Sequence, residues 1–169
     1  MPINDRWMDR VRPMYKEAYI LYMRGSLKTK PYGSHQPVLI HLLNTIKTGN
    51  VLEYGMGDHS THIMHTICQK QGRNLLSIDY ASEWMNKFLG YKNPNHEILL
   101  FDEDKLLNKE YPFFSSKFAI AFIDGSPEKD RQTMIELLKD NVDYFIVHDT
   151  EEAVGGFTYP KFSYKYDFS

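Results

Sequence analysis

VLEYGMGDHST, residues 51–61, contains the transition from which the fold of this chain can be predicted. Residues 51–54 form a short apolar strand pattern that stops at Gly55, and a helical pattern follows over residues 60–70. Gly55 and Gly57 allow the tight turn that such a transition needs. A strand, a glycine turn and a helix in this order are typical of a βαβ unit in a parallel sheet.

The rest of the chain repeats this alternation. Further strand patterns are expected at residues 75–78, 97–101, 118–123 and 144–147. Helical patterns are expected at 37–46, in a segment that carries the core residues Trp84, Met85 and Phe88, and at 128–138. This alternation predicts an α/β fold with a doubly wound, Rossmann-like, mostly parallel sheet in the strand order 3-2-1-4-5.

The two ends of the chain are expected to add to this sheet. We predict one domain over residues 1–169, with a helical lid or oligomer contact at 1–36 and a ligand-binding core at 37–150. Alternating aromatic residues within 151–169 predict a sixth strand, and a seventh strand has no pattern of its own. Because an unpaired apolar edge invites association, a homo-oligomer through this C-terminal strand is an open expectation.

Composition narrows the classes of protein. The 169 residues carry 20 Lys and Arg against 22 Asp and Glu, a net charge of −2, which argues against a nucleic-acid partner. Cys68 is the single cysteine and is expected to be a buried small apolar residue, so a reducing, cytoplasmic location is the default prediction. The sequence has neither a signal-peptide pattern nor a membrane-spanning apolar run.

Acidic residues stand at the carboxyl ends of four predicted strands: Asp79, Asp102, Asp124 and Asp149. Open parallel sheets bind ligands beyond these ends, so the placement predicts a small-molecule site. His148 lies beside Asp149 and is a candidate general base, because imidazole titrates near neutral pH. A histidine that only hydrogen-bonds at a strand end is the alternative interpretation.

Glu53 and Asp79 indicate what the site would bind. At the tip of the first strand, the Glu53 carboxylate would repel a pyrophosphate and attract an ammonium group. Ser60 stands where a dinucleotide fingerprint has its third glycine, and the helix that begins there would offer backbone N–H groups. Asp79 follows Gly57 by 22 residues, the spacing of a ribose-binding carboxylate. A tight turn that binds nothing is the alternative.

Four segments together resemble the class I S-adenosylmethionine-dependent methyltransferases: VLEYGMGDHST (51–61), LLSIDY (75–80), FAIAFIDG (118–125) and YFIVHDTEE (144–152). The resemblance implies an S-adenosylmethionine-binding turn and its helix start, made of Glu53, Gly55, Gly57, Ser60 and Thr61. It further implies that Asp79 binds the ribose and that Asp102 or Glu103 contacts the adenine. The IDG and HDT pair is similar to O-methyltransferases that act on sugars and other small hydroxylated molecules.

The same resemblance provides the expected catalytic residues, which are Asp124, His148 and Asp149. In the divalent-metal O-methyltransferases, acidic residues after the fourth and fifth strands bind the ion, so Asp124 and Asp149 make Mg²⁺ a candidate second cofactor. Two positions depart from these patterns: Pro127 stands in place of a histidine, and Thr150 in place of an asparagine.

Two other functions stay open at this stage. A nicotinamide-dependent oxidoreductase is disfavoured by Glu53 and Ser60, and a scaffold with a degenerate methyltransferase fold is favoured by Pro127. Among the remaining histidines, His35 is a candidate for covering the cofactor crevice. The helical triplet His59, His62 and His65 is expected to lie on a helix surface rather than to bind zinc.

Overall fold

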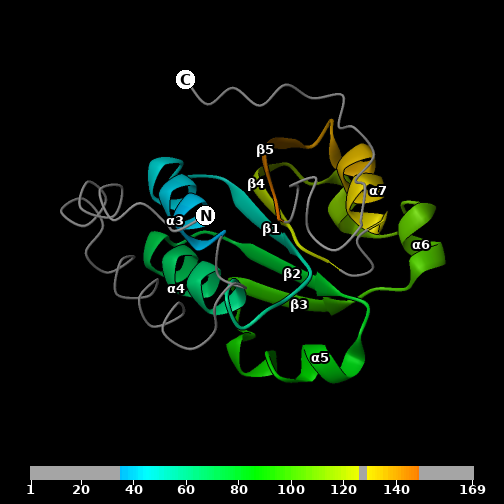
Figure 1. Ribbon diagram of the computed structural model, residues 1–169, viewed down its shortest axis with the longest axis horizontal. Coiled ribbons are helices and arrows are strands. Elements are labelled where there is room, and N and C mark those ends of the chain that lie inside the picture. The colour runs from blue at the N-terminus through cyan, green and yellow to red at the C-terminus, as the bar shows by residue number, and fades with distance from the viewer. Residues whose placement is uncertain (1–34, 126–128, 149–169) are drawn as a thin grey trace, which may run out of the picture.

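The computed structural model of the protein describes residues 35–125 and 129–148, where strands and helices alternate as expected (Figure 1). The strands are β1 (Asn50–Tyr54), β2 (Leu75–Asp79), β3 (His96–Leu100), β4 (Phe118–Ile123) and β5 (Val142–Val147). The helices are α3 (Gln36–Thr45), α4 (Thr61–Gln71), α5 (Ser82–Asn86), α6 (Glu103–Leu107) and α7 (Lys129–Leu138), with 3-10 turns η1 (Leu89–Tyr91) and η2 (Pro112–Ser115).

The five described strands form one sheet in the order β3-β2-β1-β4-β5, and every pair in it is parallel. This order confirms the predicted doubly wound fold. The order reverses between β1 and β4, and parallel strands with this reversal leave a crevice outside their carboxyl ends. The predicted strand 118–123 matches β4 at both ends, whereas β5 begins at Val142 rather than at residue 144. Helix α6 was not predicted.

Alternating side chains bury both faces of the sheet. Helices α3 and α4 cover one face, and α6 and α7 cover the other (Figure 1). Val51 of β1 packs under α3 and α4, whereas its neighbours Leu52 and Tyr54 pack on the opposite face. Cys68 of α4 is 1% exposed within the first cluster, which confirms the prediction of a buried thiol.

A smaller cluster lies under α5. Met56, Phe88 and Ile98 are buried there, and Trp84 and Met85 pack against them as partly buried residues. The prediction that the aromatic and methionine residues of this segment belong to the core is therefore confirmed for Phe88 and holds in part for the other two. The cluster positions α5 next to the turn that follows β1, because Met56 belongs to that turn.

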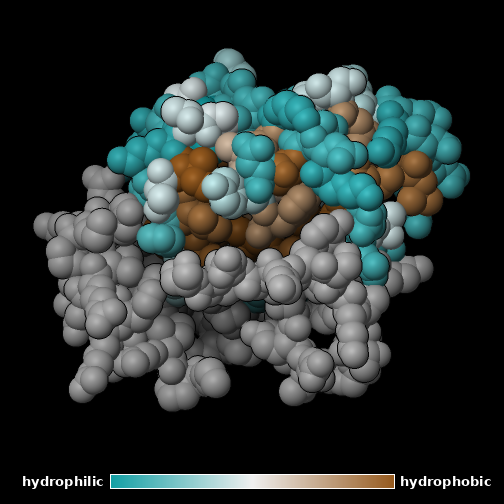
Figure 2. Space-filling view, turned by 90° about the horizontal axis from the view of Figure 1, so that it is seen from above, coloured by the Kyte–Doolittle hydropathy of each residue, from teal (hydrophilic) through white to brown (hydrophobic). Residues whose placement is uncertain are grey.

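Several predictions concern residues that the structure does not describe. The helical segment within 1–34, the sixth strand within 151–169, any oligomer contact through it, and the side chain of Asp149 all lie outside the described residues. Within the described sheet, β5 forms one edge and its Tyr144 is 52% exposed. Figure 2 views the molecule from above that edge and shows a hydrophobic area bordered by hydrophilic residues. No helix in the described part of the chain is long and apolar enough to cross a membrane.

Candidate functional site

Close packing between two loops requires glycine at the first position of the turn after β1. Gly55 has φ +88°, and a Cβ atom added to it would lie 2.4 Å from the backbone nitrogen of Gly125, which follows β4. Because β1 and β4 are neighbours, the two turns press together at the carboxyl edge of the sheet. A Cβ on Gly57 would meet only the Ser60 hydroxyl, at 3.4 Å, and His59 N, at 4.0 Å, so a ligand could approach the backbone there.

Five backbone N–H groups of this turn find acceptors within the fold. Gly55 N donates to Ile78 O, Met56 N to Asp79 Oδ2, and Gly57 N to the Thr61 hydroxyl. Ser60 N and Thr61 N both donate to Gly57 O, so the expected free N–H groups at these two positions are not observed. A phosphate cradle needs unpaired N–H donors. The turn therefore suits a ligand without a pyrophosphate group.

Glu53 is the most enclosed of the predicted site residues. It is 0% exposed, and its carboxylate accepts hydrogen bonds from Ser60 Oγ at 2.7 Å, Thr61 Oγ1 at 2.9 Å and Ser77 Oγ at 2.5 Å. Burial raises the pKa of Glu53 to about 7. The carboxylate therefore holds the start of α4 through the buried hydroxyls of Ser60 and Thr61. The predicted contact between Glu53 and a ligand ammonium group stays a prediction.

Asp79 lies at the end of β2, as predicted, and is 6% exposed. Its Oδ2 accepts from Met56 N at 3.0 Å and its Oδ1 from Ala81 N at 2.9 Å. Burial raises its pKa above the ordinary value. Because a carboxylate offers about four acceptor sites, Asp79 retains capacity for ribose hydroxyl groups.

Tyr80 is a residue that the sequence interpretation missed. It follows Asp79 directly and is 49% exposed, although aromatic side chains of its size are usually largely buried. Its ring lies 6.3 Å from that of Phe101, which follows β3. An exposed ring at the carboxyl edge offers a flat surface for a planar ligand. The sequence signal that could have identified Tyr80 was its position directly after the predicted ribose-binding aspartate.

Asp102 lies at the carboxyl end of β3, as predicted, but its side chain hydrogen-bonds to the helix that follows it. It is the N-cap of α6, and its Oδ1 accepts from Lys105 N at 3.1 Å. Aspartate is a favoured N-cap because it accepts an otherwise unpaired N–H of the first helical turn. The side chain is exposed, so the predicted adenine contact stays a prediction.

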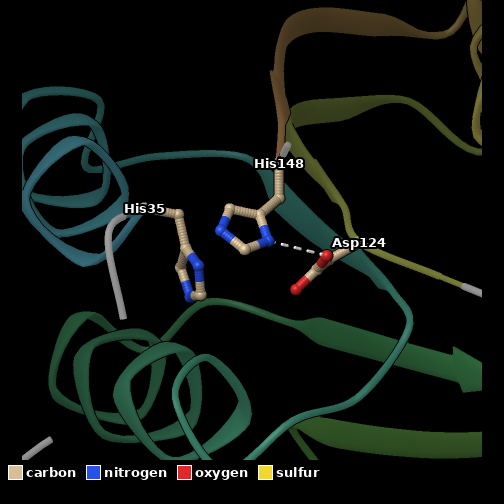
Figure 3. A group of neighbouring side chains, drawn as sticks. All are labelled: His35, Asp124 and His148. Atoms are coloured by element: carbon tan, nitrogen blue, oxygen red, sulfur yellow. Dashed lines mark hydrogen bonds and ion pairs between the residues drawn. The ribbon is translucent and has the colours of Figure 1, made fainter. Parts of the chain in front are cut away.

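The predicted catalytic residues Asp124 and His148 meet where β4 and β5 end (Figure 3). His148 Nδ1 lies 2.9 Å from Asp124 Oδ1, and both side chains are largely enclosed, with His148 10% and Asp124 23% exposed. With Nδ1 as the donor in this hydrogen bond, Nε2 becomes the basic nitrogen of His148. The sequence interpretation expected a carboxylate to orient His148, and in the structure Asp124 is a carboxylate in contact with it.

Arg131 of α7 completes this pair and was not predicted. Its Nη2 lies 3.1 Å from Asp124 Oδ1, its Nη1 donates to His148 O at 2.8 Å, and its Nε donates to Gly125 O at 2.8 Å. Three contacts from one rigid guanidinium fix the ends of β4 and β5 relative to each other. The lone arginine on an otherwise ordinary helix pattern carried no signal in the sequence.

His35 belongs to the same group, next to His148 (Figure 3). The two ring centroids are 4.5 Å apart, and His35 is 7% exposed. Burial lowers the pKa of His35 to about 4, so its imidazole is neutral near pH 7. Its Nε2 lies 3.4 Å from His59 O, and its Nδ1 has no hydrogen-bond partner among the described residues. His35 and Gln36 thus belong to the packed core, although the predicted domain limits placed them in the N-terminal extension.

The group has the composition of a metal site. One candidate ligand atom from each of His35, Asp124 and His148 lies within 4.8 Å of the others, and no other such group of three occurs among the described residues. Two neutral imidazoles and a carboxylate suit transition metals, whereas Mg²⁺ prefers oxygen ligands. Of the two predicted Mg²⁺ ligands, Asp124 belongs to this group, and Asp149 lies outside the described residues.

Of the three histidines predicted on a helix surface, His62 and His65 lie on α4, whereas His59 precedes the helix. His62 is exposed on α4, with its Nδ1 3.3 Å from the Tyr91 hydroxyl. His65 turns instead toward β3, where its Nδ1 lies 2.9 Å from His96 Nδ1.

Comparison with models of known protein families and with curated proteins gave no match for this chain. The resemblance to class I methyltransferases therefore stays a hypothesis that rests on four short segments of the sequence. The strand order and the polar groups at the carboxyl edge are the physical basis for any function assigned to the chain.

Proposed function

We propose that this protein is an S-adenosylmethionine-dependent methyltransferase that methylates a hydroxyl group of a small molecule or sugar. The observation that carries the proposal is the 2.9 Å contact between His148 Nδ1 and Asp124 Oδ1 at the carboxyl ends of β4 and β5. This contact lies on the opposite side of β1 from Asp79, so a cofactor and an acceptor would each have one half of the sheet edge.

The cofactor half consists of the glycine turn, Asp79 and Tyr80. Five of its backbone N–H groups already have acceptors within the fold. This leaves fewer donors for a pyrophosphate and favours a phosphate-free nucleoside over a dinucleotide. Asp79 would accept from ribose hydroxyls and the exposed Tyr80 ring would stack on the base. Glu53 fits a supporting role only, since its carboxylate is fully buried.

The acceptor half consists of His148, Asp124 and Arg131, and its task would be to remove a proton from the acceptor hydroxyl. When bound, S-adenosylmethionine supplies a methyl group activated by a sulfonium centre. His148 Nε2 would take the hydroxyl proton of the acceptor, and Asp124 would hold the ring and stabilise the imidazolium that forms. Arg131 keeps Asp124 in place through a 3.1 Å contact. Such a base contributes about 10²–10⁴-fold to a rate, and alignment of the reactants contributes much of the rest.

A metal-assisted route uses the same residues differently. If Asp124 and a divalent ion activate the acceptor, His148 or His35 would act as ligands and would not accept the proton. The two routes differ in a measurable way. A chelator abolishes methyl transfer by the metal route, and added Mg²⁺ or a transition metal restores it. The base route ignores chelators, and its rate rises with pH as His148 loses its proton.

Calorimetry separates the proposed function from its alternatives. We expect S-adenosylhomocysteine to bind and NAD not to bind. Binding of NAD alone would replace the proposal with an oxidoreductase, and binding of neither would favour a catalytically degenerate scaffold. A panel of sugars and catechols, assayed for methyl transfer, identifies the acceptor class.

A matched pair of variants tests His148. We expect His148→Gln to lose about 10²–10⁴-fold in methyl transfer while S-adenosylhomocysteine affinity is retained. His41→Gln is the control, because His41 is an exposed histidine on α3, away from the site. Full turnover by His148→Gln would exclude the base route.

A further inference from the structure

A row of polar side chains crosses the face of the sheet that α3 and α4 otherwise cover with apolar residues. Glu53 of β1 and Ser77 of β2 are register partners, and Ser77 Oγ lies 2.5 Å from Glu53 Oε2. Ser77 Oγ lies 2.9 Å from His96 Nε2, and His96 Nδ1 lies 2.9 Å from His65 Nδ1. Four side chains from β1, β2, β3 and α4 therefore form one continuous hydrogen-bonded chain.

The chain leads from the interior to the surface. Glu53 and Ser77 are 0% exposed and His96 is 1% exposed, whereas His65 on α4 is half-buried. Polar groups buried this deeply are costly unless their hydrogen bonds are made. Apolar residues in these positions would pack under α4 without that requirement, so the row calls for an explanation beyond packing.

Neutral histidines make the chain able to pass a proton. Burial lowers the pKa of His96 to about 4 and also lowers the pKa of His65, so neither imidazole holds a charge near pH 7. His62 of α4 also lowers the pKa of His65, and the Tyr91 ring lies 4.8 Å from the His65 ring. A neutral imidazole donates from one nitrogen and accepts at the other, which is what a relay requires.

The direction of each hydrogen bond follows from the ionised state of Glu53. Gly57 N donates to Thr61 Oγ1, which leaves the Thr61 hydrogen for Glu53. Ser77 likewise donates to Glu53, so Ser77 Oγ must accept from His96 Nε2–H. His96 Nδ1 then accepts from His65 Nδ1–H. With Glu53 ionised, every donor and acceptor in the row is matched.

We propose that this row is a proton relay through which Glu53 exchanges a proton with solvent at His65. A proton from water binds His65 Nε2, and the Nδ1 proton of His65 moves to His96 Nδ1. The Nε2 proton of His96 moves to Ser77 Oγ, and the Ser77 proton moves to Glu53 Oε2. Each intermediate group gains one proton and loses one, so the only net change is neutralisation of Glu53.

The relay would change charge at the glycine turn without opening the fold. Glu53 Oε1 keeps its hydrogen bonds from Ser60 and Thr61 in both states, because the proton arrives on Oε2. The other ionisable groups that sense Glu53 are Asp124 at the end of β4 and Cys68 of α4. Asp124 disfavours the ionised state of Glu53, which couples the relay to the charge of the proposed acceptor site.

Nitrogen-15 NMR of the imidazoles tests the relay on the ligand-free full chain, independently of methyl transfer. As pH falls and Glu53 becomes protonated, we expect neutral His96 to change from the Nε2–H to the Nδ1–H tautomer and His65 to change from Nδ1–H to Nε2–H. The carboxyl carbon signal of Glu53 reports its protonation. A His96 tautomer that stays constant while Glu53 titrates, or a His96 that becomes imidazolium in that range, would overturn the proposal.

Two variants sharpen the test. In Glu53→Gln, the amide N–H₂ would donate to Ser77 and hold His96 as the Nδ1–H tautomer at every pH. In Ser77→Ala, the His96 tautomer would no longer follow pH. His62→Gln is the matched control, since His62 lies one turn from His65 outside the row. It removes a group that lowers the pKa of His65, but the His96 tautomer should change with Glu53 protonation as in the parent. A parent-like tautomer change in either Glu53→Gln or Ser77→Ala would overturn the relay.

Discussion

A Cβ atom on Gly55 would lie 2.4 Å from the backbone nitrogen of Gly125, and one on Gly125 would lie 2.2 Å from Cε1 of Tyr54. The turns after β1 and β4 therefore interlock without room for a side chain at either position. This contact joins the cofactor half of the sheet edge to the acceptor half, because Gly125 follows Asp124 directly. The two glycines have a structural role that is separate from any ligand.

Gly55→Ala should destabilise the fold. A left-handed φ of +88° costs a non-glycine residue about 1–2 kcal/mol, and overpacking against Gly125 costs a further 1–3 kcal/mol or so. Urea denaturation measures the combined loss in the free energy of unfolding. Gly57→Ala is the matched control, because its Cβ meets no atom closer than 3.4 Å. Gly57→Ala should retain stability and weaken S-adenosylhomocysteine binding; equal loss of stability in both variants would contradict this distinction.

Glu53 should make stability depend on pH near neutrality. Its folded pKa of about 7 lies above the ordinary 4.5, so the folded state binds the proton more tightly than the unfolded state does. The contribution of Glu53 to the free energy of unfolding is therefore largest below pH 4.5. About 3 kcal/mol of it is lost as pH rises to about 7. Urea denaturation over a pH series should show that Glu53→Gln gains stability relative to the parent across this window.

The buried histidines change stability with pH in the direction opposite to Glu53. His35 and His96 have folded pKa values of about 4, below the ordinary 6.5, so they favour the folded state increasingly as pH rises from 4 to 6.5. For this reason the Glu53 effect has to be measured as a difference between variant and parent. A difference that is constant with pH would mean that Glu53 has the same pKa in the folded and unfolded states, which would contradict the raised pKa.

Asp79→Asn and Tyr80→Ala should both weaken S-adenosylhomocysteine binding. Loss of a charged hydrogen-bond acceptor costs about 1–3 kcal/mol, and loss of an aromatic stacking surface about 0.5–1.5 kcal/mol. Calorimetry gives both values. Tyr144→Ala is the control for Tyr80, since Tyr144 is equally exposed, at 52%, but lies on the edge strand β5. Unchanged affinity in both variants would remove the predicted nucleoside site from the β2 end.

Asp102→Ala should mainly affect stability. The side chain caps α6, and removal of an aspartate N-cap costs about 0.5–2 kcal/mol. We expect the affinity for S-adenosylhomocysteine to stay near that of the parent. A tenfold loss of affinity would instead support the adenine contact that the family resemblance implies, and Lys105→Ala serves as a control on the same helix turn.

Much of the fold could be predicted because it depends on local patterns. Runs such as 118–123 are apolar at nearly every position, which is typical of a strand buried on both faces, and glycine or aspartate marks where each strand stops. Parallel strands with intervening helices leave few possible orders. The same reasoning placed Asp79, Asp102 and Asp124 at one edge of the sheet, where the structure has them.

Which polar groups touch was decided by the tertiary structure alone. The sequence by itself determined that Glu53 lies near the carboxyl end of a strand, but the contacts that enclose its carboxylate come from Ser60, Thr61 and Ser77. His148 contacts Asp124, which lies 24 residues earlier in the chain, and His35 joins them from the residue before α3. Sequence periodicity reports which face a side chain occupies, whereas contact between residues far apart in the chain depends on strand register and helix packing.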